Sequence, residues 1–199
     1  MTFFRRATLT LLAVGLLAPA MASAFEYKVL TTPVTAKGEN HSFTAGEAII
    51  TCKKAEFKYT GTEGKHPTID VTPAYKECKV LESAATVTVE KAQFEFGVPH
   101  EVKTNEFSLK SSVVGETGAK IKVTATISSE KCEVTFPAQT ILGETTKFLN
   151  NGGKTGGEVK SRLEGVEYKS NSKCAGFVGK EGKNGTYEGN AAEAGLIVE

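Results

Sequence analysis

Tryptophan is absent from this chain, and Asp70 is its only aspartate. Calcium-binding loops place several aspartates at short intervals, because small carboxylates let several oxygens converge on one ion. A single aspartate therefore excludes loops of this kind. Large aromatic faces are the usual stacking surface for sugars, and tryptophan offers the largest. A sugar-binding role is disfavoured for this reason, although five tyrosines are present.

An excess of charge of either sign is also missing. The chain holds 24 lysines and arginines against 23 acidic residues, and the lysines are scattered among glutamates. Proteins that bind nucleic acid or anionic lipid need clustered Lys and Arg, because these cations attract phosphates and release their counterions. We expect no nucleic-acid partner.

Long apolar runs are missing after the first 24 residues, which have the three parts of a secretory signal peptide. Arg5 and Arg6 form a basic start, residues 7–20 are apolar, and residues 22–24 (Ala-Ser-Ala) form a cleavage site. An apolar run of about 14 residues is short for a bilayer, which needs about 20. We expect cleavage after Ala24 rather than an uncleaved anchor, by either the Sec or the twin-arginine route. The predicted mature protein, 25–199, has no membrane span and is secreted or extracytoplasmic.

Motifs for catalysis and metal binding are missing as well. The chain has no Gly-x-Ser-x-Gly elbow, and His41, His66 and His100 are too far apart for a His-Glu-x-x-His pair. We expect these histidines on exposed turns, because Asn or Pro stands beside each. The sequence thus predicts no catalytic, cofactor-binding or metal-ligating residue, and no cofactor. Glycoside hydrolysis uses two carboxylates across a cleft, and the many glutamates do not single out a pair.

Four cysteines are present, an even number that suits disulfides in an oxidising compartment. Three pairings are possible, and we favour Cys52 with Cys78 and Cys132 with Cys174, because each pair joins segments of similar type within one half of the chain. Loops of these lengths correspond to about 3.5 and about 4 kcal/mol of stabilisation in the chain-entropy description. No two cysteines are closer than 26 residues, whereas redox and zinc sites favour close spacing such as Cys-x-x-Cys.

Short β-branched and alternating runs recur along the mature chain, separated by Gly, Pro, Asn or Ser. They predict strands near residues 25–30, 48–51, 55–59, 68–72, 86–89, 94–96, 107–109, 121–127, 132–136, 140–142, 159–163, 166–168 and 196–198. No window has helical periodicity. This pattern predicts an all-β fold, an antiparallel β-sandwich or a barrel-like domain stapled by two disulfides. We expect one domain over 25–199, with two packed lobes, about 25–100 and 101–199, as the alternative.

Two local features are predicted in more detail. Val87 and Val89 have one parity and Phe94 and Phe96 the other, which predicts a hairpin with a two-residue turn at Glu90-Lys91. Asn and Gly cluster over residues 150–157 and predict a mobile connecting loop.

Four segments together resemble a group of exported, cysteine-containing, β-rich bacterial proteins with no assigned function. They are residues 50–52 (Ile-Thr-Cys), 71–78 (Val-Thr-Pro-Ala-Tyr-Lys-Glu-Cys), 132–139 (Cys-Glu-Val-Thr-Phe-Pro-Ala-Gln) and 184–189 (Asn-Gly-Thr-Tyr-Glu-Gly). In that group a further cysteine often follows the hairpin turn, where this chain has Ala92. The resemblance implies export and a β fold, and it transfers no active site.

Taken together, these features favour a non-catalytic exported protein that binds an extracellular or cell-surface partner, or contributes to the cell exterior. The alternative is a secreted hydrolase or glycan-active protein whose site forms only in three dimensions.

Overall fold

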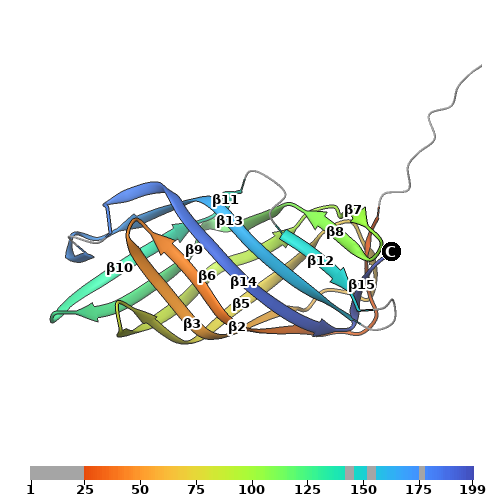
Figure 1. Ribbon diagram of the computed structural model, residues 1–199, viewed down its shortest axis with the longest axis horizontal. Coiled ribbons are helices and arrows are strands. Elements are labelled where there is room, and N and C mark those ends of the chain that lie inside the picture. Colours follow the sequence, from red (N-terminus) through yellow and green to blue (C-terminus); the bar gives the residue numbers. More distant parts are fainter. Residues whose placement is uncertain (1–24, 142–145, 152–155, 175–177) are drawn as a thin grey trace, which may run out of the picture.

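The computed structural model describes residues 25–141, 146–151, 156–174 and 178–199. Within these ranges, eight antiparallel strands form a closed barrel in which each strand pairs with its neighbours in chain order, and β14 returns to pair with β2 (Figure 1). The barrel strands are β2 (Val34–Ala45), β3 (Ala48–Tyr59), β5 (Ile69–Val80), β6 (Ser83–Phe96), β9 (Ser111–Ile127), β10 (Glu130–Pro137), β13 (Gly156–Ser170) and β14 (Glu181–Ala194). The predicted all-β, barrel-like class is confirmed.

Additional strands gather at one end of the barrel (Figure 1). The first part of β13 also pairs with β12 (Thr146–Asn150), which continues through β8 (Glu106–Leu109) to β7 (His100–Lys103). A separate sheet places β1 (Tyr27–Val29) between β15 (Leu196–Val198) and β4 (Gly64–His66), and we call this sheet the cap. The short β11 (Gln139–Thr140) pairs with β9.

The predicted hairpin at Glu90-Lys91 is wrong, because β6 runs through this point without turning. Lys91 has a φ of 53°, and the pairing of β6 with β9 shifts register between Glu90 and Ala92. The change of parity therefore marks a β-bulge, which inserts a residue, reverses the inward and outward alternation, and bends the strand. Asn40 in β2 and Glu77 in β5 also have positive φ, at 57° and 55°, and the burial alternation changes parity beside each. The bulge at Lys91 explains why the predicted runs 86–89 and 94–96 are two parts of one long strand.

Both predicted disulfides are present. Cys52 and Cys78 face each other directly in the ladder between β3 and β5, with Cα atoms 3.9 Å apart. Cys132 of β10 is joined to Cys174 in the short 3-10 turn η1 (Ser172–Cys174), with Cα atoms 4.7 Å apart. The two bridges are compatible with an oxidising, extracytoplasmic location.

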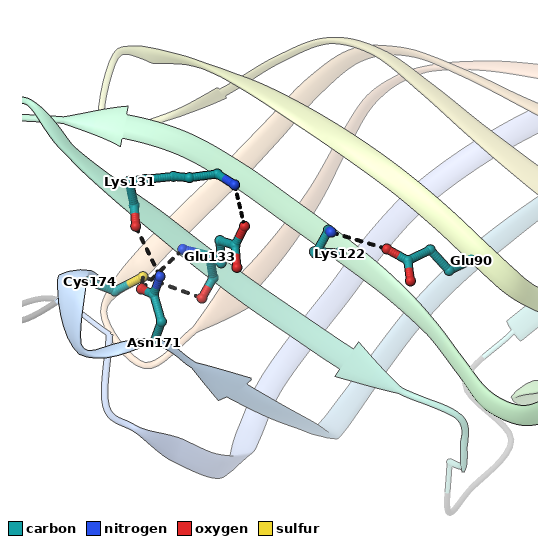
Figure 2. A network of polar contacts seen from close by, with 6 residues as sticks. All are labelled: Glu90, Lys122, Lys131, Glu133, Asn171 and Cys174. Carbon is teal, nitrogen blue, oxygen red and sulfur yellow. Dashed lines mark hydrogen bonds and ion pairs between the residues drawn. The ribbon is translucent and has the colours of Figure 1, made fainter.

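The Cys132–Cys174 bridge lies at the seam where the barrel closes. Over the described residues, the backbone ladder between β10 and β13 holds only two pairs, Val134 with Ser170 and Thr135 with Lys169. Side-chain amides extend this seam on both sides. The side chain of Asn171 accepts a hydrogen bond from the Glu133 backbone at 3.2 Å and donates one to the Lys131 carbonyl at 2.9 Å (Figure 2).

On the other side of the seam, the side chain of Gln139 has the same role. It accepts a hydrogen bond from the Glu167 backbone N–H at 2.6 Å and donates one to the Glu167 carbonyl at 3.1 Å. Asn171 and Gln139 therefore replace ladder hydrogen bonds that the diverging strands cannot make, and buried or half-buried backbone groups are satisfied as a result.

Apolar side chains point into the barrel, and charged side chains cover its outside. The middle of the barrel is filled by rings in edge and tilted contact, with centroids 4.9 to 6.2 Å apart: His41, Phe43, Phe57, Tyr75, Phe94 and Tyr187. Outside, cross-strand ion pairs are common, as between Glu90 and Lys122 at 3.1 Å (Figure 2). Burial of the inner faces is the main source of stability of such a domain.

Several sequence predictions fall at the limits of the described ranges. The signal peptide, residues 1–24, and residues 152–155 of the predicted loop lie outside them. Gly156 and Gly157 begin β13 rather than belonging to a loop. Within the described ranges, no helix combines the length and the hydrophobicity that crossing a bilayer requires.

Candidate ligand cavity inside the barrel

A cavity lies inside the capped end of the barrel, because small residues face large ones there. On the inner face of β13 and β14, Ser161 pairs with Gly189 and Val159 pairs with Ala191. Rings of Phe57 and other residues line the cavity around this strip of small side chains. The described residues that line the cavity are Tyr27, Val34, Ala36, His41, Phe57, Tyr59, Ile69, Val71, Phe94, Phe96, Leu109, Phe148, Val159, Ser161, Tyr187, Gly189, Asn190, Ala191, Glu193 and Leu196.

The cavity volume is about 40 Å³. At about 10 to 15 Å³ for each water-sized probe, this is room for about three water molecules. Three lining residues, Ser161, Gly189 and Asn190, also border a polar groove on the outer surface. The barrel wall is therefore thin where Gly189 contributes no side chain.

His41 lies inside the barrel wall, so the expectation of an exposed turn is wrong for this residue. Its side chain is 1% exposed, and its Nδ1 atom lies 2.8 Å from the hydroxyl of Tyr187. A Cβ atom on Gly189 would lie 2.1 Å from Nδ1, and one on Gly38 would lie 2.5 Å from Nε2. The imidazole thus occupies space that two glycines leave free, where the pairing of β14 with β2 is interrupted.

The electrostatics of His41 follow from this burial. Burial lowers the pKa of His41, and the nearby backbone of Asn190 opposes that shift. Nε2 has no hydrogen bond of good geometry to the described residues. The neutral imidazole is bonded to Tyr187 and fills the space where the pairing of β2 with β14 is interrupted. It brings no positive charge to the cavity.

Glu193 is the acidic group of the cavity. It is 8% exposed, and its Oε2 atom accepts a hydrogen bond from the backbone N–H of Leu196 at 2.9 Å. This bond holds the turn from β14 into β15 of the cap. Oε1 has no hydrogen bond of good geometry among the described residues. Burial raises the pKa of Glu193 to about 7, against the opposing effect of the Leu196 and Gly157 backbone, because a carboxylate without a counterion is costly in an apolar site.

A chain of buried hydroxyls ends at Ser161. Thr146 donates to Ser161 at 3.0 Å, and Ser111 lies 2.7 Å from Thr146. A hydroxyl has one proton, so Thr146 must accept from Ser111. Ser161 then accepts from Thr146, and its own proton is not used within this chain of hydroxyls.

The cap covers the cavity with buried apolar side chains and with side-chain hydrogen bonds to the barrel end. The Tyr27 hydroxyl donates to the Gly97 carbonyl at 2.8 Å, and its ring packs edge-on against Phe148 with centroids 6.4 Å apart. The side chain of Asn150 forms two hydrogen bonds with the backbone of Val198, at 2.7 and 3.0 Å. These side-chain contacts hold strands of only three residues each over the end of the barrel.

The other two histidines lie elsewhere. His66 is in β4 of the cap, with Nε2 2.9 Å from the Thr62 carbonyl, and His100 is in β7. In the part of the chain that the structure describes, no three His, Cys, Asp or Glu side chains form a group that could hold a metal.

No sequence pattern marks the cavity residues Ser161, Gly189 and Glu193, since only strand pairing brings them together. Comparisons of the chain with protein-family models, curated proteins and solved structures found no significant match. A proposal for the function therefore depends on the geometry of the cavity.

Proposed function

We propose that this protein is an exported, non-catalytic binding protein that holds a small, mainly apolar ligand in the capped end of its barrel. The observation that carries this proposal is the cavity, whose apolar lining contains a few polar groups with unused hydrogen-bonding capacity. Eight-stranded barrels are wide enough either to be filled by side chains or to hold one small ligand. Pockets for small molecules typically combine an apolar lining with a few well-placed polar groups.

Export is supported by the signal-peptide pattern of residues 1–24 and by the two disulfides. The outward positions of the barrel strands carry Lys, Glu and Thr, as is expected of a barrel surrounded by water. A non-catalytic role is supported by the acidic groups of the cavity. Glu193 is the one carboxylate among its described lining residues, whereas glycoside hydrolysis uses a pair.

Binding of a ligand as large as a benzene ring requires the cap to move. A cavity of about 150 Å³ accepts a benzene molecule, and the closed cavity measures about 40 Å³. The cap can shift as a unit, because among the described residues it is a separate sheet with no strand ladder to the barrel. Its outward motion exposes Tyr27, Leu196 and Val198, which are buried in the closed state. We expect the cap to shift outward on binding, while the aromatic cluster in the middle of the barrel stays in place.

The test is binding of the neutral dye N-phenyl-1-naphthylamine to the oxidised mature chain, followed by dye fluorescence. We expect saturable binding with one site for each chain. Ala191 lines the cavity, while its neighbour Ala192 is exposed on the outer face of β14. Ala191→Leu should weaken binding at least tenfold by filling the cavity, and Ala192→Leu should leave it unchanged.

Folding of both variants is checked by circular dichroism, because an added side chain in a packed interior can destabilise the fold. Should Ala191→Leu not fold, Ala191→Val provides a smaller filling of the same site. Absence of saturable binding, or equal loss in the Ala191 and Ala192 variants, would overturn the proposal.

A further inference from the structure

We infer that the ligand is a small organic cation, an amine with an apolar body, and that its charged nitrogen binds Oε1 of Glu193. This inference rests on the proposed function, since it names the class of molecule that the same cavity takes. Three observations support it: the single acidic side chain among the described lining residues, the Oε1 atom of Glu193, and the aromatic rings around the cavity.

The described lining of the cavity has an acidic group and no basic partner for it. Among the described lining residues, Glu193 is the one acidic side chain, and no Lys, Arg or Asp accompanies it. His41 is held neutral by burial, as its lowered pKa indicates. A carboxyl group placed in an apolar site without a partner is costly, and a bound cation removes that cost by supplying the missing counter-charge. A neutral or anionic ligand would leave the cost in place.

The two carboxylate oxygens of Glu193 have different surroundings. Oε2 of Glu193 is used by the Leu196 backbone, which accounts for the structural role of this residue at the turn into the cap. Oε1 belongs to a side chain more than nine-tenths buried and forms no hydrogen bond of good geometry within the described ranges, although the Gly157 backbone lies close to the carboxylate. The structural role therefore leaves one acceptor free, and an ammonium group is a donor that suits it.

Aromatic rings surround the cavity that contains Glu193. Besides Tyr187, which is hydrogen-bonded to His41, the described lining contains four phenylalanines and two tyrosines. They are Phe57, Phe94, Phe96, Phe148, Tyr27 and Tyr59. The face of an aromatic ring attracts a cation, and the attraction increases when both are removed from water. Rings together with one carboxylate form a site that selects an amine over a neutral molecule of the same shape.

The experiment compares benzylamine with benzyl alcohol, two probes of similar shape that differ in charge. Binding to the oxidised mature chain is measured at pH 8 by isothermal titration calorimetry and by amide chemical shifts. We expect benzylamine to bind at least tenfold more tightly than benzyl alcohol. Glu193→Gln should remove this preference, because it weakens benzylamine binding at least tenfold, while its amide oxygen can still accept from Leu196.

The matched control is Glu188→Gln, which removes an exposed carboxylate from the same strand. We expect it to retain the preference for benzylamine. Equal loss in the two variants would assign the effect to general surface charge and overturn the inference. The thermal unfolding of each variant is measured alongside, so that a change in binding can be separated from a change in folding.

Failure of this inference can be distinguished from failure of the proposed function. Equal binding of both probes that is lost in Ala191→Leu would overturn the amine assignment and keep the cavity. Binding of neither probe to the unaltered chain would overturn both.

Discussion

Asn171 is bonded to both backbone groups of Glu133. Its side-chain oxygen accepts from the Glu133 N–H at 3.2 Å, and its own N–H donates to the Glu133 carbonyl at 3.0 Å. One residue thus continues the β10–β13 seam beyond the two backbone pairs of that ladder. The relationship shows how an eight-stranded barrel can close over a short seam, by side-chain amides that stand in for backbone.

Replacement of Asn171 should weaken the seam measurably. Asn171→Ala removes the hydrogen bonds to Glu133 and Lys131 and leaves their backbone groups without these partners. We expect a loss of about 1 to 3 kcal/mol in the free energy of unfolding, the usual cost of such groups. Urea denaturation measures it, with Asn184→Ala at an exposed position of β14 as the control. Equal effects of the two variants would mean that the amide of Asn171 does not stabilise the closure.

The two disulfides should differ in what their loss does to the barrel. Cys132–Cys174 lies at the short seam, whereas Cys52–Cys78 lies within the long β3–β5 ladder. Chain entropy assigns about 4 and about 3.5 kcal/mol to the two bridges. We expect the Cys132→Ser/Cys174→Ser variant to lose amide-exchange protection where β10 faces the end of β13, because only two backbone pairs join the two strands there.

The Cys52→Ser/Cys78→Ser variant provides the comparison for the seam. It should lose stability globally and retain the order of protection among the strands, because backbone pairs flank the bridge on both sides. Hydrogen exchange followed by mass spectrometry distinguishes the two outcomes. Selective loss of protection at β3 and β5, with the seam intact in the other variant, would contradict this assignment.

The fold class and the disulfide pairing could be predicted because they depend on local signals. Cysteine spacing and runs of β-branched residues are visible along the chain. β2 and β14 were not predicted, although they are the first and last strands of the barrel and pair with each other. Their inward positions include Gly38 and Gly189 in place of large apolar residues, and the bulge at Asn40 reverses the alternation within β2. A strand with glycines on its buried face does not show the period that identifies strands.

The candidate site could not be predicted for a related reason. Glu193 is one of many glutamates in the sequence, and nothing near it in the chain marks it as buried. Its burial follows from the pairing of β14 with β13 and from the turn that Leu196 begins. His41 was placed on an exposed turn because Asn40 precedes it, and that asparagine is instead the residue with positive φ at a bulge. The same local signal serves for turns and for bulges, and only long-range pairing separates them.

Glycine is required at position 189 by the ring of His41. A Cβ atom there would lie 2.1 Å from Nδ1, so Gly189→Ala forces the imidazole or the strand to shift. We expect a loss of about 1 to 3 kcal/mol in the free energy of unfolding, as for overpacked interiors. Gly179→Ala is the control, because the nearest atom to a Cβ at Gly179 is at 3.7 Å.

The double variant Gly189→Ala/His41→Ala tests the cause of that loss. Removing the ring frees the space that the new methyl group needs. The two substitutions should therefore be less destabilising together than the sum of their separate effects. Additive losses would show that His41 is not the group that requires glycine at position 189.

The stability of the protein should depend on the ionisation of Glu193. Burial raises its pKa in the folded protein to about 7, from an ordinary value of 4.5. The folded state therefore holds this proton more tightly than the unfolded state does. The resulting stabilisation is complete below about pH 4.5 and is lost as pH rises through about 7. Its upper limit is about 3.5 kcal/mol, from about 1.4 kcal/mol for each pKa unit.

Glu193→Gln isolates this contribution, because the amide cannot ionise and keeps an oxygen for the Leu196 N–H. The difference in unfolding free energy between the variant and the unaltered protein, measured by urea denaturation at pH 5 and pH 8, should move in favour of the variant at the higher pH. Glu188→Gln, at an exposed position, should show no such change. A difference that is constant between pH 5 and pH 8 would mean that Glu193 ionises equally well in both states, and that the capped end of the barrel admits water or a cation to its carboxylate even when closed.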